Sequence, residues 1–245
     1  MVDLFFAAGK RGFILAPIRF RLKAPEIQNL LDRLNPAFVF YEDEFSDLFS
    51  SLSHPSSVRA SYELNDDPCS AYKNQLAQAP ATEANQPLKL TDTFLLIHTG
   101  GTTSLPKICQ ISHQQVVWNS VEIVSSSSGT IGIAKELVTL PFYHIGGWNI
   151  FVPYVHFGGF VVLIRKFDPE QALDLIQQFE IDTLPAVENM LLQLKQSPSF
   201  EEKTKNVRIV YTGGAACSLE SMKPFWDQGI PAVQSYGLTE AGPSN

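Results

Sequence analysis

A loop rich in glycine and hydroxyl side chains is the first place where the sequence indicates chemistry. Residues 98–107 read HTGGTTSLPK. Paired glycines let a backbone approach a ligand closely, and backbone N–H groups, hydroxyls and a lysine are groups that bind a polyphosphate. Composition alone favours a simpler alternative, a Gly/Thr-rich hairpin turn with a solvated lysine. The loop is not a Walker A motif, because Pro106 stands where a glycine must precede the lysine.

Further segments of unusual composition follow in order along the chain. LPFYHIGG occupies residues 140–147, while VYTGGAA and QSYGLTEAGP occupy residues 210–216 and 234–243. The first loop and the last two follow predicted strands, and ligands of layered α/β proteins gather at the carboxyl ends of strands. The sequence has no G-x-G-x-x-G or G-x-S-x-G motif, which weakens the dinucleotide-dehydrogenase and α/β-hydrolase interpretations.

Taken together, these segments resemble the signature motifs of the AMP-forming acyl-CoA synthetases and their adenylate-forming relatives. The loop at 98–107, followed by ICQISH, is similar to the family's phosphate-binding motif. Residues 140–147 resemble its motif of an aromatic residue and a histidine before glycine, and the last two segments resemble its adenine-binding pair. The connecting residues 16–22 and 158–187 follow the family as well, so the resemblance covers nearly the whole chain apart from 53–89.

The resemblance implies a ligase that uses ATP, releases AMP, and needs Mg²⁺ and coenzyme A. On the matching positions, it implies that the ATP phosphates are held by Thr99, Gly101, Thr102, Thr103 and Lys107. The adenine-binding positions would be Gly213, Gly214, Ala215, Gln234, Ser235, Tyr236 and Gly237, with the tyrosine ring stacked on the base. Thr239 would hydrogen-bond the α-phosphate and Glu240 would hold Mg²⁺, which suits a carboxylate combined with phosphate oxygens.

The resemblance also implies where the carboxylic acid binds. His144 would lie near the substrate carboxylate, and Trp148 and Asn149 would border the acyl pocket, whose aromatic and apolar surroundings suit a fatty or aryl acid. Each residue also has a plain interpretation: Tyr236 and Trp148 as core aromatics, His144 as a core histidine and Glu240 as a surface carboxylate. The presence of all the motifs in order favours the functional interpretation.

The sequence departs from the family pattern in ways that leave other functions open. Gly100 stands where the family has serine, Ser104 and Ile108 stand where it has glycine, and residues 186–190 lack its usual Val-Pro-Thr-Met. The family's ribose-binding aspartate and its catalytic lysine have no match in the chain. We therefore expect residues 1–245 to be an inactive or ATP- and acyl-binding part of the large domain. The alternatives are a non-catalytic nucleotide-binding remnant, a fold that binds nothing, or an enzyme that adenylates without coenzyme A, such as a fatty acyl-AMP ligase or a peptide-synthetase adenylation domain.

The elements that would position these residues alternate between strand and helix. Helix starts are predicted at Pro25, Ser112, Asp168 and Ser218, from cap residues followed by apolar positions at helical spacing. Short apolar runs predict strands at 37–41, 94–98, 160–164, 207–211 and 232–234. We expect an α/β fold with a layered, mostly parallel sheet flanked by helices. Residues 53–89, rich in Ser, Pro, Asn and Gln, are interpreted as a variable connection.

Composition narrows the choice of partners. The 18 basic and 25 acidic residues give a net charge of −7, so no basic surface for nucleic acid is expected. Three scattered cysteines predict neither disulfides nor a zinc site and fit the cytoplasm. Residues 137–164 form a run of 28 without a charged side chain, but its prolines and glycines divide it into strand, loop, helix and strand instead of a membrane span. The expected partners are a small carboxylic acid, ATP and coenzyme A.

Overall fold

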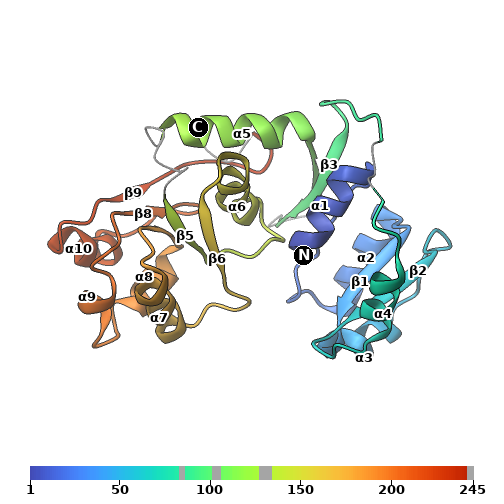
Figure 1. The fold of residues 1–245 in the computed structure, drawn as a ribbon, viewed down its shortest axis with the longest axis horizontal. Helices are drawn as coiled ribbons and strands as arrows, with labels where there is room; N and C mark the ends of the chain where they lie inside the picture. The colour runs from blue at the N-terminus through green and yellow to red at the C-terminus, as the bar shows by residue number, and fades with distance from the viewer. Residues whose placement is uncertain (83–85, 101–105, 127–133, 242–245) are drawn as a thin grey trace. The chain divides into compact units, whose positions relative to one another are not determined.

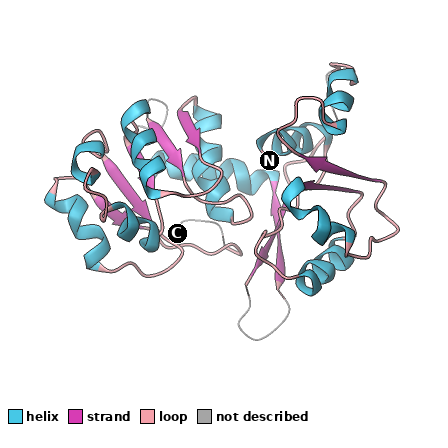
Figure 2. Ribbon diagram, turned by 90° about the horizontal axis from the view of Figure 1, so that it is seen from below, coloured by secondary structure: helices cyan, strands magenta, loops and turns pink. Residues whose placement is uncertain are grey.

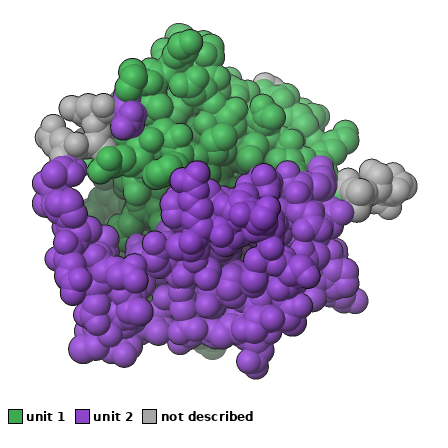
Figure 3. Space-filling model, turned by 90° about the vertical axis from the view of Figure 1, so that its right-hand side faces the viewer, with its two compact units in different colours: residues 1–17, 87–245 green, residues 18–86 purple. Residues whose placement is uncertain are grey.

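A computed structural model describes residues 1–82, 86–100, 106–126 and 134–241. The chain divides into two compact units, one formed by residues 1–17 and 87–245 and the other by residues 18–86 (Figure 3).

The larger unit contains a five-stranded parallel sheet in the order β6-β5-β7-β8-β9 (Figure 1). Its strands are β5 (Lys135–Val138), β6 (Phe160–Leu163), β7 (Thr183–Pro185), β8 (Ile209–Thr212) and β9 (Ala232–Gln234). The helices between and after them are α6 (Ile145–Phe157), α7 (Pro169–Phe179), α8 (Glu188–Leu194), α9 (Phe200–Lys203) and α10 (Leu219–Asp227). Helices lie against the strands (Figure 2), which confirms the predicted α/β fold with a mostly parallel sheet.

Two clusters of buried side chains support the strand ends. The first packs Leu137, Leu184 and Val210 of the sheet against α7, α8 and α10, and these three side chains have no exposed surface. The second joins α6 to α1 (Val2–Arg11) and to the antiparallel hairpin of β3 (Thr93–Thr99) and β4 (Lys107–Ser112). Val138, the last residue of β5, belongs to this second cluster, so the hairpin packs with the end of that strand.

Local cap chemistry explains where the helices begin. The Asp168 carboxylate accepts a hydrogen bond from the Gln171 N–H at 2.9 Å at the start of α7. Ser112 and Gln115 form the predicted reciprocal box that starts α5 (His113–Ser126). Ser218 precedes α10 as predicted, but it acts differently: its N–H donates to the Glu188 carboxylate at 2.8 Å.

The smaller unit corrects the interpretation of residues 53–89 as a loose connection. It contains α2 (Ala24–Leu34), β1 (Phe38–Glu42), η1 (Asp43–Phe45), α3 (Ser46–Ser50), β2 (Ala60–Leu64) and α4 (Ala71–Gln78). β2 pairs in parallel with β1, and the Tyr62 ring stacks on Phe40 at 5.0 Å and meets Tyr72 of α4 at 5.8 Å. Aromatic packing therefore gives regular structure to a segment whose polar composition does not predict it.

Residues 137–164 fold as the sequence predicts, into the end of β5, a loop, α6 and β6. Among the residues that the structure describes, no helix is long and apolar enough to cross a membrane.

Candidate active site

The glycine- and threonine-rich loop connects the two strands of the β3–β4 hairpin. Thr99 and Lys107 face each other as the last pair of that ladder. Lys107 is exposed, so its ammonium group is available to a ligand. The two interpretations of the loop, a hairpin turn and a phosphate-binding site, therefore do not exclude each other, because the same hairpin presents Thr99 and Lys107. Gly101, Thr102 and Thr103 lie outside the described residues, as does Ser104.

Glu240 lies close enough to this hairpin to perturb it electrostatically. The pKa of the Cys109 thiol on β4 is raised, first by burial and then by the negative charge of Glu240. The positive charge of Lys107 and a hydrogen bond with the Thr99 side chain act in the opposite direction. The fold therefore gathers a carboxylate, an ammonium group and a hydroxyl from two segments that are far apart in sequence.

The two predicted adenine-binding segments lie side by side at the carboxyl ends of β8 and β9. The Ser235 N–H donates to the Thr212 carbonyl at 2.8 Å, and the Cys217 N–H donates to the side-chain oxygen of Gln234 at 3.2 Å. A Cβ on Gly213 would lie 2.8 Å from the Ser235 hydroxyl oxygen and 3.0 Å from its carbonyl oxygen. Gly213 therefore permits a close approach that another residue would prevent.

The surface formed by these segments is open to solvent. Gly214, with φ of +82°, and Ala215 are exposed on one segment, and Gly237 is half-buried on the other. The Tyr236 side chain is 65% exposed, so the core interpretation of this tyrosine is wrong. An exposed aromatic ring beside a glycine-rich turn is a surface on which a flat ring can stack.

His144 is also exposed and not a core histidine. It occupies the cap position of α6, where its N–H donates to the Pro141 carbonyl at 3.1 Å and its ring lies 4.6 Å from that of Tyr143. A Cβ on Gly147 would lie 2.7 Å from the Pro141 oxygen. The glycine thus lets the first turn of α6 pack directly on the loop after β5.

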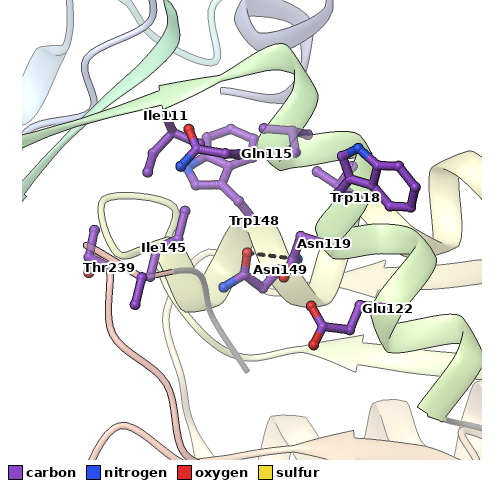
Figure 4. A pocket seen from close by; sticks show the side chains of 12 residues that line it. Ile111, Gln115, Trp118, Asn119, Glu122, Ile145, Trp148, Asn149 and Thr239 are labelled. Carbon is purple, nitrogen blue, oxygen red and sulfur yellow. Dashed lines mark hydrogen bonds between the residues drawn. The ribbon is translucent and has the colours of Figure 1, made fainter. Parts of the chain in front are cut away.

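A pocket of about 160 Å³ lies next to the start of α6 (Figure 4). It is lined from α5 and β4 by Ile111, Gln115, Val116, Trp118, Asn119 and Glu122, from α6 and its start by Ile145, Trp148, Asn149 and Val152, and from the last segment by Thr239 and Ala241. Trp148 and Asn149 therefore do border a pocket. Trp148 is also a core aromatic, 1% exposed and stacked on Phe5 at 4.6 Å, so its plain interpretation is confirmed, while its role at an acyl pocket stays a prediction.

Sequence reasoning missed the contribution of α5. Gln115, Asn119 and Glu122 are spaced at three- and four-residue intervals, so they lie along one side of the helix. This polar stripe is visible in the sequence directly after the glycine-rich loop, but the sequence does not say which side of α5 faces a pocket. The Asn119 amide nitrogen donates to the side-chain oxygen of Asn149 at 3.0 Å, linking α5 to α6 (Figure 4).

Comparison with known proteins places the chain in a family. Residues 1–244 match the family described as AMP-binding enzyme. Feruloyl-CoA synthase of Amycolatopsis is 25% identical over 99% of this chain and 47% of its own length. Fatty acid–[acyl-carrier-protein] ligase ScoC of Streptomyces coeruleorubidus is 29% identical over 98% of this chain and 46% of its own.

Solved structures agree with the sequence comparisons. The inhibitor-bound N-terminal domain of FACL13 from Mycobacterium tuberculosis superposes with a TM-score of 0.87 at 26% identity, over 98% of this chain and 60% of that one. The chain spans about half the length of the curated relatives it matches. By the match over residues 1–244, the chain belongs to the AMP-binding enzyme family.

Proposed function

We propose that this chain carries the ATP- and acid-binding surfaces of a ligase that activates a carboxylic acid as an acyl adenylate and passes it to the thiol of coenzyme A. One observation carries the proposal: adjacent residues join the two halves of the site. Thr239 lines the pocket, while the charge of Glu240 acts on the β3–β4 hairpin that carries Lys107. An acid in the pocket and a polyphosphate at the hairpin would therefore meet at this dipeptide.

The main contributions of the protein to this reaction are to position the two substrates and to neutralise their charge. A carboxylate oxygen attacks the α-phosphorus of ATP, an O–P bond forms, and the bond to pyrophosphate breaks. The thiol then attacks the acyl carbon, loses its proton and displaces AMP. Lys107 and Thr99 would bind the departing phosphates, and the Thr239 hydroxyl would hold the α-phosphate at the pocket end. His144, exposed at the start of α6 next to Ile145 of the pocket, would face the carboxylate.

The described residues fit a magnesium ion that is held jointly with a phosphate. No group of three His, Cys, Asp or Glu side chains able to hold a metal occurs in the described part of the chain. Mg²⁺ is usually bound by one or two carboxylates together with substrate phosphates, so the exposed Glu240 carboxylate suits it. The ion would neutralise charge on the phosphates, while Glu240 fixes its place.

Calorimetry with ATP and Mg²⁺ tests the nucleotide half. Tyr236→Ala removes the stacking ring and should weaken binding about tenfold or more, whereas Glu240→Ala should make binding insensitive to Mg²⁺. Phe157→Ala and Glu202→Ala remove an exposed ring and an exposed carboxylate elsewhere and serve as matched controls. Equal affinities in all five proteins would refute the assignment, and absence of binding would favour a fold that holds no nucleotide.

A second candidate differs only in the thiol acceptor. The similarity to a fatty acid–[acyl-carrier-protein] ligase supports a carrier-protein thiol in place of coenzyme A. Exchange of labelled pyrophosphate into ATP reports adenylation without any thiol, and thioester formation is then compared between coenzyme A and a carrier protein. Adenylation with neither acceptor used would favour an enzyme that stops at the adenylate.

A further inference from the structure

Two unsatisfied polar atoms belong to residues of one pocket. In the part of the chain that the structure describes, the buried side-chain atoms without a hydrogen-bond partner are Asn29 Oδ1, Asn119 Oδ1, Glu136 Oε1 and Trp148 Nε1. Asn119 and Trp148 both line the pocket next to Thr239. Leaving a buried acceptor unpaired is costly, so a donor group of a ligand is a physical explanation for the unpaired Asn119 oxygen.

The hydrogen bond to Asn149 fixes which end of the Asn119 amide is free. Because the Asn119 nitrogen donates to the Asn149 side-chain oxygen, the Asn119 oxygen is left to accept. Asn119 is only 7% exposed, and its side-chain oxygen is buried without a hydrogen-bond partner among the described residues. The complementary ligand group is a donor: a hydroxyl or an amine.

The size of the pocket limits the ligand that carries this donor. Its volume of about 160 Å³ is close to that of a protein cavity that binds one benzene ring. Ile111, Val116, Ile145 and Val152 supply apolar walls. A single ring fits these dimensions.

The arrangement of the lining residues sets the direction of the ligand. In Figure 4, Thr239 and Ile145 lie on one side of the Asn119–Asn149 pair and Glu122 lies on the other. A carboxylate that reacts beside Thr239 therefore directs the rest of the molecule towards Asn119 and Glu122. The exposed Glu122 carboxylate attracts a donor there and repels a second carboxylate.

We propose that the acid taken by this pocket is about one ring in size and carries a hydroxyl or amino group remote from its carboxylate, with Asn119 as the residue that selects it. This inference rests on the proposed function, which places the reacting carboxylate at Thr239. The Asn119 oxygen accepts a hydrogen bond from the hydroxyl or amino group of the acid. Asn149 holds the Asn119 amide in the orientation that leaves this oxygen free.

The test is a comparison of closely matched acids on the unmodified chain, with and without ATP and Mg²⁺. The acids are the three isomers of hydroxybenzoate, benzoate, terephthalate and dodecanoate, and calorimetry gives each dissociation constant. The best hydroxybenzoate isomer should bind about tenfold more tightly than benzoate, and terephthalate and dodecanoate should bind more weakly still. Equal binding of hydroxybenzoate and benzoate, tighter binding of dodecanoate, or no binding of any acid would overturn the inference.

Variants assign the preference to Asn119. Asn119→Leu keeps the approximate size of the side chain and should bind benzoate and hydroxybenzoate equally. Asn29→Leu removes the same kind of unpaired amide from α2 of the other unit and should keep the preference. If Asn119→Leu does not unfold cooperatively, the comparison of acids on the unmodified chain still tests whether the pocket prefers a ring that carries a hydroxyl. A hydroxybenzoate preference without any ATP binding would support the pocket and refute the proposed function, so the two failures are distinguishable.

Discussion

Replacing Gly213 by alanine would test whether the two adenine-binding segments work as one surface. The new Cβ would lie 2.8 Å from the Ser235 hydroxyl oxygen and 3.0 Å from its carbonyl oxygen. The hydroxyl can rotate, but the carbonyl belongs to the backbone. Ordinary contacts of a Cβ begin near 3.4 Å, so the backbones of residue 213 and Ser235 must separate by a few tenths of an ångström.

That movement is transmitted directly to Tyr236, the next residue in the chain. A stacked aromatic ring contributes about 1–3 kcal/mol to the binding of a base, so a displaced Tyr236 ring is expected to weaken ATP binding about tenfold. Overpacking should also lower the free energy of unfolding by about 1–3 kcal/mol. Calorimetry with ATP and Mg²⁺ measures the first effect and urea unfolding measures the second.

A second glycine provides the control. Gly158, after α6, has φ of +76° and no atom within 4 Å of an added Cβ. Gly158→Ala should therefore cost stability through backbone strain, about 1–2 kcal/mol, without changing ATP affinity. If Gly213→Ala binds ATP as tightly as the unmodified chain, or if both variants weaken binding equally, the pairing of the two segments is not what forms the nucleotide surface.

Three further predictions concern the scaffold. Burial first, and then the Asp182 charge, raises the pKa of Glu136 well above its usual range. The folded state then binds the extra proton, so stability should fall by about 1.4 kcal/mol per pH unit as the pH rises from the usual glutamate range towards the raised value. Glu136→Gln should flatten this slope in urea unfolding, and parallel profiles would contradict it. Gly147→Ala, whose Cβ would meet the Pro141 oxygen at 2.7 Å, should cost about 1–3 kcal/mol; an unchanged thermal midpoint would argue against that contact. Asp168→Ala should cost about 1 kcal/mol by removing the cap of α7, while Asp168→Asn should cost less.

The fold could be predicted where local chemistry and burial agree. Asp168 and the Ser112–Gln115 box start helices as their residue types indicate, and strand 232–234 has the predicted bounds. Residues 53–89 could not be predicted, because β2 and α4 are ordered by packing of Tyr62 and Tyr72 with Phe40 of β1. The composition of a segment does not show which residues elsewhere in the chain will pack against it.

Family motifs located the candidate site, but not its walls. The motifs named Thr239, Trp148 and Asn149, which the fold gathers around one pocket. Asn119 and Glu122 lie outside every family motif in the sequence, so the motifs could not name them. Which side of α5 faces the pocket depends on its packing against α6, a tertiary contact that helical spacing alone does not determine. The roles of the motif residues in binding ATP and Mg²⁺ stay predictions until they are measured.

The approach of Glu240 to the β3–β4 hairpin has a consequence for folding. The charge that acts on Cys109 comes from a residue 240 − 109 = 131 positions later, so these groups meet only when distant parts of the larger unit come together. Contacts of such long range form slowly, and the nucleotide surface should be among the last features to appear during refolding. Because the unfolded chain has no such surface, ATP would bind only the folded unit. At a concentration one hundred times its dissociation constant, ATP would then add about 2.7 kcal/mol to the stability of that unit as a whole.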